Sequence, residues 1–313
     1  RHLPLPSHRA APGAVRGAVR HPARARSGRR RPALRGGVRP RHRWKDVAKR
    51  APASRQRAAD RRGENGSRRE RLASSSAAVR GDRRARRSAV KTLVLHGFAG
   101  SPGAFARFFS DAGAPCLPGH GSAPDASSWE DALARLEPDE PVAVFGYSMG
   151  ARLALALALR RPEAVRELIL ESGTAGIEDA VQRARRKADD DALADFIERE
   201  GMEKFVDQRE QHPTLASLRP FAAQLRPERL AHRPGGLASA LRHLGAGAQP
   251  SYWSELRDVR VTVRLITGAR DEKFSALAAR MLELLPRAQL ISIPDCGHAP
   301  HLERPQAFVE ALR

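Results

Sequence analysis

The fold is decided by residues 142–152, which read VAVFGYSMGAR. An apolar run of strand length, Val142 to Phe145, leads directly into the pattern Gly146-x-Ser148-x-Gly150, and an apolar stretch of helical period follows. A sharp strand-to-helix turn needs small residues two positions before and after its serine, because backbone segments approach closely there. Such a turn raises the serine hydroxyl above the end of a sheet, so Ser148 is a candidate nucleophile. An ordinary glycine-flanked turn is the alternative.

Strand-like and helix-like segments alternate along the rest of the chain from Lys91 onward. We expect strands at 92–95, 142–145, 167–170, 261–266 and 290–293, and helices at 102–111, 128–136, 149–159, 276–285 and from 305. This alternation is typical of an α/β protein with a mostly parallel sheet flanked by helices. At about 177–244 a charged helical stretch without strand signals predicts a helical cap, inserted before the last two strands.

A serine nucleophile needs a base and an acid, and both follow later strands. Asp271 comes after the strand that ends in LITGARDEKF, and His298 comes after the last strand, in ISIPDCGHAPH. The carboxyl ends of parallel strands meet at one edge of a sheet, where open α/β sheets place their sites. We therefore expect His298 to take the Ser148 proton while Asp271 orients the imidazole. Glu272 and Asp295 are the alternative acids.

Two further turns contain histidines. The first strand runs into LVLHGFAGS, and the turn segment LPGHGSAP, from Leu117 to Pro124, follows a short strand. At the first of these turns the N–H of Phe98, together with the N–H of Met149, is expected to bind a developing negative oxygen. His96 is expected to be a structural hydrogen-bonding residue. His120 is expected to belong mainly to turn structure rather than to a ligand site.

The basic charge of the chain is confined to its first part. The formal net charge is +21, but residues 1–88 hold 28 basic and five acidic side chains, and residues 89–313 hold 28 basic and 30 acidic ones. Nucleic-acid binding is therefore not expected of residues 89–313, which we take as one domain. Residues 1–88 are rich in Arg, Ala and Pro and are expected to be disordered sequence from upstream of the true translation start. A basic arm for nucleic acid or an anionic surface, or a transit peptide, is the alternative.

Several classes of protein are not favoured. Cys116 and Cys296 are too few for a disulfide framework, and no Cys or His cluster has the spacing of a metal site. The most apolar run, 153–159, is far shorter than the roughly 20 residues of a membrane span. Residues 1–30 contain no apolar core of a secretory signal. We expect a cytoplasmic protein with no metal, cofactor or membrane span.

The motifs together resemble one family. From Thr92 to the C-terminus the chain resembles α/β-hydrolase-fold proteins and, within them, the 2-succinyl-6-hydroxy-2,4-cyclohexadiene-1-carboxylate synthases of menaquinone biosynthesis. The motifs that carry the resemblance are LHGFAGS, LPGHGS, GYSMGARLAL, LILESGTAGI, QRARRKADD, AQPSYWSEL, GARDEKF and CGHAPHLERP. The resemblance implies a metal-free lyase that eliminates pyruvate from 2-succinyl-5-enolpyruvyl-6-hydroxy-3-cyclohexene-1-carboxylate. Its triad is implied to act as a base on carbon.

Arginines support an anionic substrate. Arg152 lies one helical turn after Ser148, where a fixed cation serves a carboxylate and gives nothing to a neutral ester. We therefore expect a small-molecule polycarboxylate as the substrate. The resemblance also places Tyr147, Arg186 and Arg233 at the pocket.

The cap departs from the family pattern. Relatives usually carry a Trp followed by a Pro-Leu-Phe-like segment, whereas this chain reads FVDQREQHPTLAS from Phe205 to Ser217. Gln208 or Arg209 stands where the Trp would fall, which concerns the apolar side of the pocket and not the triad. A serine carboxylesterase remains the alternative function, because it would use the same triad.

Overall fold

The computed structural model describes residues 91–313; the expectations for residues 1–88 lie outside this part of the chain. Within it, six strands form one sheet in the order β2-β1-β3-β4-β5-β6, and every pairing is parallel. The strands are β1 (Thr92–Leu95), β2 (Ala112–Gly113), β3 (Val142–Tyr147), β4 (Val165–Glu171), β5 (Thr262–Gly268) and β6 (Ala288–Ile293). Parallel neighbours require crossover connections, so both faces become covered by helices. The expected α/β fold is confirmed.

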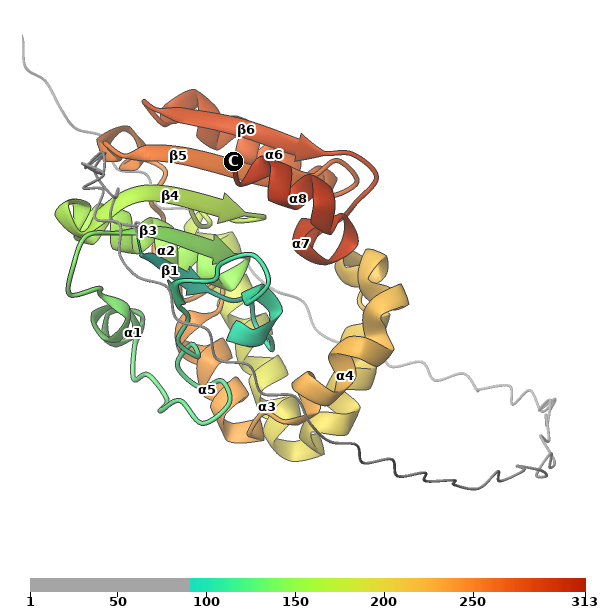
Figure 1. Ribbon diagram of the computed structural model, residues 1–313. Helices are drawn as coiled ribbons and strands as arrows, with labels where there is room; N and C mark the ends of the chain where they lie inside the picture. Colours follow the sequence, from blue (N-terminus) through green and yellow to red (C-terminus); the bar gives the residue numbers. More distant parts are fainter. Residues whose placement is uncertain (1–90) are drawn as a thin grey trace, which may run out of the picture. The chain divides into compact units, whose positions relative to one another are not determined.

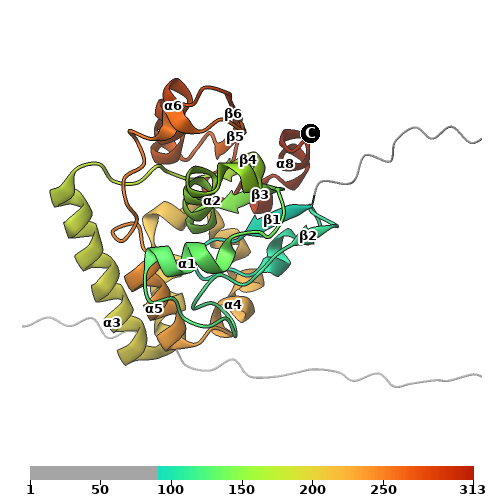
Figure 2. The same ribbon diagram turned by 90° about the vertical axis from the view of Figure 1, so that its left-hand side faces the viewer.

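Helices lie on both faces of the sheet (Figures 1 and 2). One face carries α1 (Trp129–Leu136), α2 (Met149–Arg160) and α6 (Glu272–Leu284), and the other carries α8 (Pro305–Ala311) and the 3-10 turn η1 (Pro102–Phe105). Successive strand residues supply the two cores in turn. Leu95, Val144, Leu168 and Leu265 pack on the first side, and Val94, Phe145, Ile169 and Ile266 on the second. Burial on both faces is the reason that these strands are continuously apolar in sequence.

The cap is built from the segment between β4 and β5. It consists of α3 (Ala180–Gln211), the 3-10 segment η3 (Pro213–Phe221), α4 (Ala222–Leu230) and α5 (Pro234–Leu244). Figures 1 and 2 show the three helices grouped on one side of the sheet. Side chains of α3 and α5, among them Ile197, Phe205 and Leu237, form an apolar core of the cap. Gly201 interrupts α3 with a φ of 82°, which glycine adopts at little cost.

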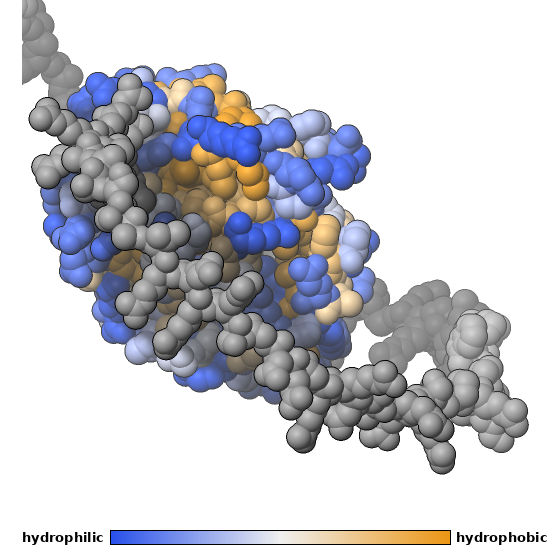
Figure 3. Space-filling model, in the orientation of Figure 1, coloured by the Kyte–Doolittle hydropathy of each residue, from blue (hydrophilic) through white to orange (hydrophobic). Residues whose placement is uncertain are grey.

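Short elements complete the chain. They are η2 (Pro162–Ala164), η4 (Leu256–Asp258) and α7 (Pro300–Glu303). On the face seen in Figure 3, hydrophobic residues gather over the sheet and hydrophilic residues surround them. Among residues 91–313, no helix combines the length and the apolar character needed to cross a bilayer.

Two expected helices begin or end elsewhere. The helix expected at 102–111 is only the single turn η1. The rings of Phe105 in this turn, and of Phe108 and Phe109 after it, pack on Phe145 and Phe308. Anchoring of these rings in the core outweighs a weak helical tendency. The helix expected from 276 begins four residues earlier, at Glu272 in α6. Its first turn forms because the Asp271 carboxylate accepts a hydrogen bond from the Phe274 N–H.

Candidate active site

Ser148 lies in a strained turn between β3 and α2. Its φ of 51° and ψ of −103° are rare for a residue other than glycine. A Cβ on Gly146 would lie 2.4 Å from the Gly150 carbonyl oxygen, and a Cβ on Gly150 would lie 2.0 Å from the Leu95 carbonyl oxygen. The Ser148 N–H donates to the Glu171 carbonyl of β4 at 2.9 Å. Both glycines are therefore required by the backbone that presents the serine.

His298 lies between Ser148 and Asp271. Its Nε2 is 3.1 Å from Ser148 Oγ, and its Nδ1 is 2.7 Å from Asp271 Oδ2. An ionised carboxylate only accepts hydrogen bonds, so Nδ1 carries the proton and Nε2 can accept the serine hydroxyl. The side chains of His298 and Asp271 are 6% and 7% exposed, so their attraction is little screened by water. The structure thus brings together the three side chains singled out by motif order.

The choice among the candidate acids follows from the loops after β5 and β6. These loops meet backbone to backbone, because a Cβ on Gly268 would lie 2.1 Å from the Gly297 carbonyl oxygen. This contact sets Asp271 beside His298. Glu272, by contrast, is exposed in the first turn of α6. Asp295 is mostly exposed and binds Arg270 at 2.7 Å, so neither alternative acid contacts the imidazole.

Tyr147 packs beside the base. Its ring centroid is 5.6 Å from that of His298, and the Phe274 ring lies 4.6 Å from the same imidazole. Burial raises the pKa of the Tyr147 phenol, so the hydroxyl stays neutral. The two rings restrict rotation of the imidazole. Tyr147, expected at the pocket from the resemblance, therefore lies directly against the His298 imidazole.

A second buried histidine and carboxylate pair was not anticipated from the sequence. The backbone N–H and Nδ1 of His301 each donate to Glu171 Oε1 at 2.9 Å, and both side chains are almost fully buried. Since the Glu171 carbonyl also holds the Ser148 N–H, this residue connects the nucleophile turn to helix α7, which follows the base. The available signal was a glutamate closing an apolar strand, in LILESG, and a histidine three residues after His298.

Histidines hold the loop after β1. His96 accepts the Leu117 N–H through Nε2 at 3.0 Å and donates to the Gly97 carbonyl through Nδ1 at 2.8 Å. His120 accepts the Ala99 N–H through Nε2 at 3.1 Å. Burial lowers the pKa of His96 to about 4 and that of His120 well below its usual value, so both stay neutral and can accept. Both residues brace the loop that contains Phe98.

Met149 and Phe98 are the expected oxyanion donors. Met149 is the first residue of α2. The backbone N–H groups there have no partner within the helix and lie at the positive end of the helix dipole. Phe98 lies in the loop between β1 and η1 that the histidines brace. Met149 directly follows Ser148, and a Cβ on Gly97, next to Phe98, would lie 3.6 Å from the Ser148 Cβ, so both residues lie beside the Ser148 turn.

Arg152 is a buried cation beside the nucleophile. Its side chain is 8% exposed, its Nη1 makes a long 3.4 Å hydrogen bond to Gln249 Oε1, and its guanidinium lies 6.0 Å from the Trp129 ring. Burial, with a smaller contribution from the nearby Arg186, lowers its pKa to about 10, which leaves it charged at neutral pH. No carboxylate in the described part of the chain forms an ion pair with it. A buried cation without an ion-pair partner is stabilised when an anionic group binds beside it.

The two cap arginines expected at the pocket differ from each other. Arg186 lies close enough to Arg152 to lower its pKa, and it pairs with Asp190 at 2.8 Å while 43% exposed. Arg233 instead donates to the Ala123 carbonyl at 3.0 Å and to Asp125 at 2.7 Å. It ties the start of α5 to the loop after His120, and half of its side chain is exposed. The structure brings Arg186, and not Arg233, toward Arg152.

Two other cap arginines lie near Tyr147, of which Arg229 is buried and Arg209 is partly buried. Arg209 donates from Nη2 to the Phe98 carbonyl at 3.1 Å, and Arg229 is 6% exposed and lies 3.7 Å from Glu210. Both interact electrostatically with Tyr147, and burial lowers the pKa of each. The sequence pointed to Arg209 only through the missing Trp. Arg229 gave no signal that set it apart from other arginines of the cap.

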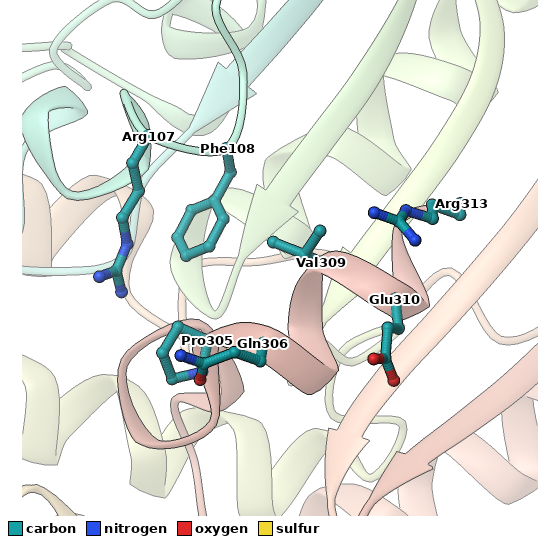
Figure 4. Close-up of a pocket in the computed structure, with 7 residues that line it drawn as sticks. All are labelled: Arg107, Phe108, Pro305, Gln306, Val309, Glu310 and Arg313. Carbon is teal, nitrogen blue, oxygen red and sulfur yellow. The ribbon is translucent and has the colours of Figure 1, made fainter.

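A surface hollow of about 450 Å³ lies elsewhere (Figure 4). Its lining residues are Arg107, Phe108, Pro305, Gln306, Val309, Glu310 and Arg313. None of the three triad side chains lines this hollow. In residues 91–313, no three His, Cys, Asp or Glu side chains are arranged to hold a metal ion.

Relatives of known name include both synthases and an esterase. A putative 2-succinyl-6-hydroxy-2,4-cyclohexadiene-1-carboxylate synthase of Bacillus subtilis is 40% identical over 171 residues, which are 53% of this chain and 62% of that protein. The synthase of Serratia proteamaculans is 31% identical, over 63% of this chain and 79% of that protein. A pimeloyl-[acyl-carrier protein] methyl ester esterase of Aromatoleum aromaticum is 34% identical, over 61% of this chain and 82% of that protein. The chain thus spans less than two thirds of the length of the Bacillus relative.

The same likeness holds in three dimensions. The solved structure of MenH from S. aureus matches with a TM-score of 0.68 and 30% sequence identity, over 71% of this chain and 91% of that chain. Residues 92–311, the whole sheet and cap, match the family model described as alpha/beta hydrolase. The chain belongs to the alpha/beta hydrolase family.

Proposed function

We propose that the chain is a carbon-oxygen lyase of menaquinone biosynthesis. It eliminates pyruvate from 2-succinyl-5-enolpyruvyl-6-hydroxy-3-cyclohexene-1-carboxylate and leaves 2-succinyl-6-hydroxy-2,4-cyclohexadiene-1-carboxylate. A C–H bond and the C–O bond to the enolpyruvyl group break, a ring C=C forms, and the proton ends on the released pyruvate. The reaction consumes neither water nor an oxidant, so the triad and the pocket are sufficient for its balance. Likeness to the Bacillus and Serratia synthases supports the proposal.

Ser148, His298 and Asp271 are the proposed catalytic residues. Ser148 Oγ removes the proton from carbon while its own proton passes to His298 Nε2, 3.1 Å away. Asp271 stabilises the imidazolium that forms, through the 2.7 Å bond to Nδ1. The N–H groups of Phe98 and Met149 stabilise the negative oxygen that develops as the proton leaves. The imidazolium then returns its proton toward the leaving pyruvate.

Arg152 is the observation that favours a lyase over an esterase. A buried guanidinium with no paired carboxylate, one helical turn after Ser148, suits a substrate that carries carboxylates. The proposed substrate has several, and Arg186 lies on the same side of the site. We propose that both arginines, together with Tyr147, bind it. Arg233 is left out because it is engaged by Asp125.

The proposal is tested by the release of pyruvate. The purified chain is mixed with the cyclohexene substrate, and pyruvate is followed by coupled oxidation of NADH with lactate dehydrogenase. Pyruvate formation that depends on both the chain and Ser148 supports the lyase. If the folded protein forms no pyruvate from this substrate, the proposal is contradicted.

A serine carboxylesterase is the second candidate, because the triad geometry also suits acyl transfer. An esterase would release p-nitrophenol from p-nitrophenyl acetate in a burst that matches the enzyme concentration, as the Ser148 acyl-enzyme accumulates. The lyase should give almost no burst. An acyl-enzyme trapped during turnover would favour the esterase.

We further propose that residues 89–313 are the catalytic domain and act in the cytoplasm on a small molecule rather than on nucleic acid. The match of residues 92–311 to the family supports this boundary. Removal of residues 1–88 is then expected to leave pyruvate release unchanged and to lower the basic pI. Loss of activity or solubility on removal would contradict the boundary.

A further inference from the structure

The peptide bond between Phe98 and Ala99 is held on both of its edges. Its carbonyl oxygen accepts a hydrogen bond from Arg209 Nη2 at 3.1 Å, and its N–H donates to His120 Nε2 at 3.1 Å. One of these partners comes from the loop after β2, and the other comes from the cap helix α3. This peptide directly follows the Phe98 N–H that we propose as an oxyanion donor. Holding this peptide restrains the φ and ψ of Phe98 and so limits the directions that the Phe98 N–H can take.

Arg209 also contacts the side chain of Phe98. Its guanidinium lies 5.3 Å from the centroid of the Phe98 ring, and that ring makes edge contacts with Phe205 at 5.9 Å and with His120 at 5.7 Å. One arginine of the cap thus binds both the backbone and the ring of Phe98. Through it, the cap and the oxyanion loop form a continuous contact.

The surroundings of Arg209 are costly for a cation. Its Nε is buried and has no acceptor in the part of the chain that the structure describes. Burial, and then the neighbouring Arg229, lowers the Arg209 pKa to about 10, so the charge is retained at neutral pH. A buried cation that is balanced by neutral acceptors is usually less stable than an apolar side chain of similar size. Stability alone therefore gives no reason for an arginine here.

We propose that Arg209 is a positioning residue of the oxyanion hole, which fixes the Phe98–Ala99 peptide from the cap and supplies positive charge behind it. The charge favours the state in which negative charge develops on the substrate oxygen. The inference rests on the proposed function in one respect: the developing charge is taken to be that of the elimination. Any other reaction that places negative charge in the same oxyanion hole should also depend on Arg209.

Three substitutions separate the hydrogen bond from the charge. Arg209→Met removes both, Arg209→Gln can keep a donor without the charge, and Arg209→Lys keeps the charge and a donor of different geometry. Arg199→Met is the matched control, since Arg199 lies on the same helix, is 65% exposed and pairs with Glu200. Thermal unfolding of each variant shows whether it is folded.

In pyruvate release, kcat of Arg209→Met is expected to fall about 10-fold to 100-fold, less than for direct loss of an oxyanion donor, while KM changes less than about threefold. Arg209→Lys should retain more activity than Arg209→Gln, because the charge is kept. Arg199→Met should match the wild type. A rise in KM with kcat unchanged would overturn the proposal, because Arg209 would then only bind substrate.

A second reaction makes the test independent of the natural substrate. Diisopropyl fluorophosphate is neutral; Ser148 Oγ bonds to phosphorus, fluoride leaves, and the phosphoryl oxygen occupies the oxyanion hole. The rate of this modification is expected to fall in the same order of variants. If the wild type releases no pyruvate but Arg209 variants still slow phosphorylation, the proposed function fails and the inference stands. If folded Met and Gln variants react at the wild-type rate, the inference is wrong.

Discussion

The carboxyl edge of the sheet and the cap use charge in opposite ways. At the sheet edge, histidines and carboxylates form pairs, as in the 2.7 Å contact between Asp271 and His298. In the cap, several arginines form ion pairs at the surface, such as Arg242 with Asp195 and Glu198. Arg209 and Arg229 differ from these, because burial lowers the pKa of each.

The difference has a structural origin. Parallel strands deliver their following loops to one edge, so residues distant in sequence converge there by topology. A position in a cap helix does not predict such convergence, because charged residues of one helix can face either solvent or the site. Position at a strand end therefore indicates a functional residue from the sequence, whereas a charged residue of the cap indicates one only when it is buried.

The strongest test of the sheet edge is removal of the base or the nucleophile. Ser148→Ala and His298→Ala are each expected to lower kcat for pyruvate release about 1000-fold or more, because either loss disables the whole unit. The double variant should be no worse than the single variants. Steady-state kinetics with thermal unfolding as a folding check measure this. Additive losses would show that the two residues act separately.

Arg152 lies where the two regions meet, because it belongs to α2 on the sheet and is close to Arg186 of the cap. Arg152→Ala is expected to cost about 2 to 4 kcal/mol in kcat/KM, roughly 30-fold to 1000-fold, through the loss of a charged contact in a shielded site. Arg152→Lys should recover only part of it, because lysine lacks the planar fork that matches a carboxylate. Hydrolysis of a neutral ester by the same variant is the control. An equal loss on both substrates would mean that Arg152 supports α2 rather than the substrate.

The histidines that brace the oxyanion loop predict acid sensitivity. The folded state lowers the His96 pKa from 6.5 to about 4, so its contribution to stability is complete above pH 6.5 and is lost as the pH falls toward 4. By pH 5 this amounts to roughly 2 kcal/mol, at about 1.4 kcal/mol per pH unit below 6.5. Urea unfolding between pH 7.5 and 5 measures it.

In the same series His96→Gln, which can still accept the Leu117 N–H, should lose less stability on acidification than the wild type. His243→Gln, in the cap helix α5, is the control and should keep the wild-type slope. Identical slopes for wild type and His96→Gln would show that His96 is not responsible.

Arg233 provides the smallest expected effect and the sharpest contrast within the cap. Its ion pair with Asp125 is half exposed, so Arg233→Ala is expected to change stability by less than about 1 kcal/mol. Pyruvate release should change less than about threefold, whereas Arg186→Ala should raise KM more. Kinetics of the two variants side by side decide this. A larger loss for Arg233→Ala would return it to the substrate site.

The sequence by itself determined the fold class and the members of the candidate triad. Gly146 and Gly150 mark the turn because the backbone approaches to 2.4 Å or less of where a Cβ would stand, a local requirement that spacing alone reveals. Asp271 and His298 could be chosen because each follows a strand whose apolar run is readable. Parallel topology then sets them at the same edge.

Only the tertiary structure decided the rest of the site. The sequence favoured Asp271 over Glu272 and Asp295, and the close contact of Gly268 with Gly297 brings the Asp271 carboxylate within 2.7 Å of His298. The pairing of Glu171 with His301 joins residues 130 positions apart, a separation that no local pattern encodes.

The arginines of the cap show the same limit. Helix α3 is charged along most of its length, so its sequence does not mark which side is covered. The fold buries Arg209 against Phe98 and leaves Arg233 half exposed on Asp125. Burial is a property of the packed chain, since it depends on which distant segment lies against each side chain. For that reason charge in the sequence predicted an anionic substrate, and the packing of the cap decided which cations can face it.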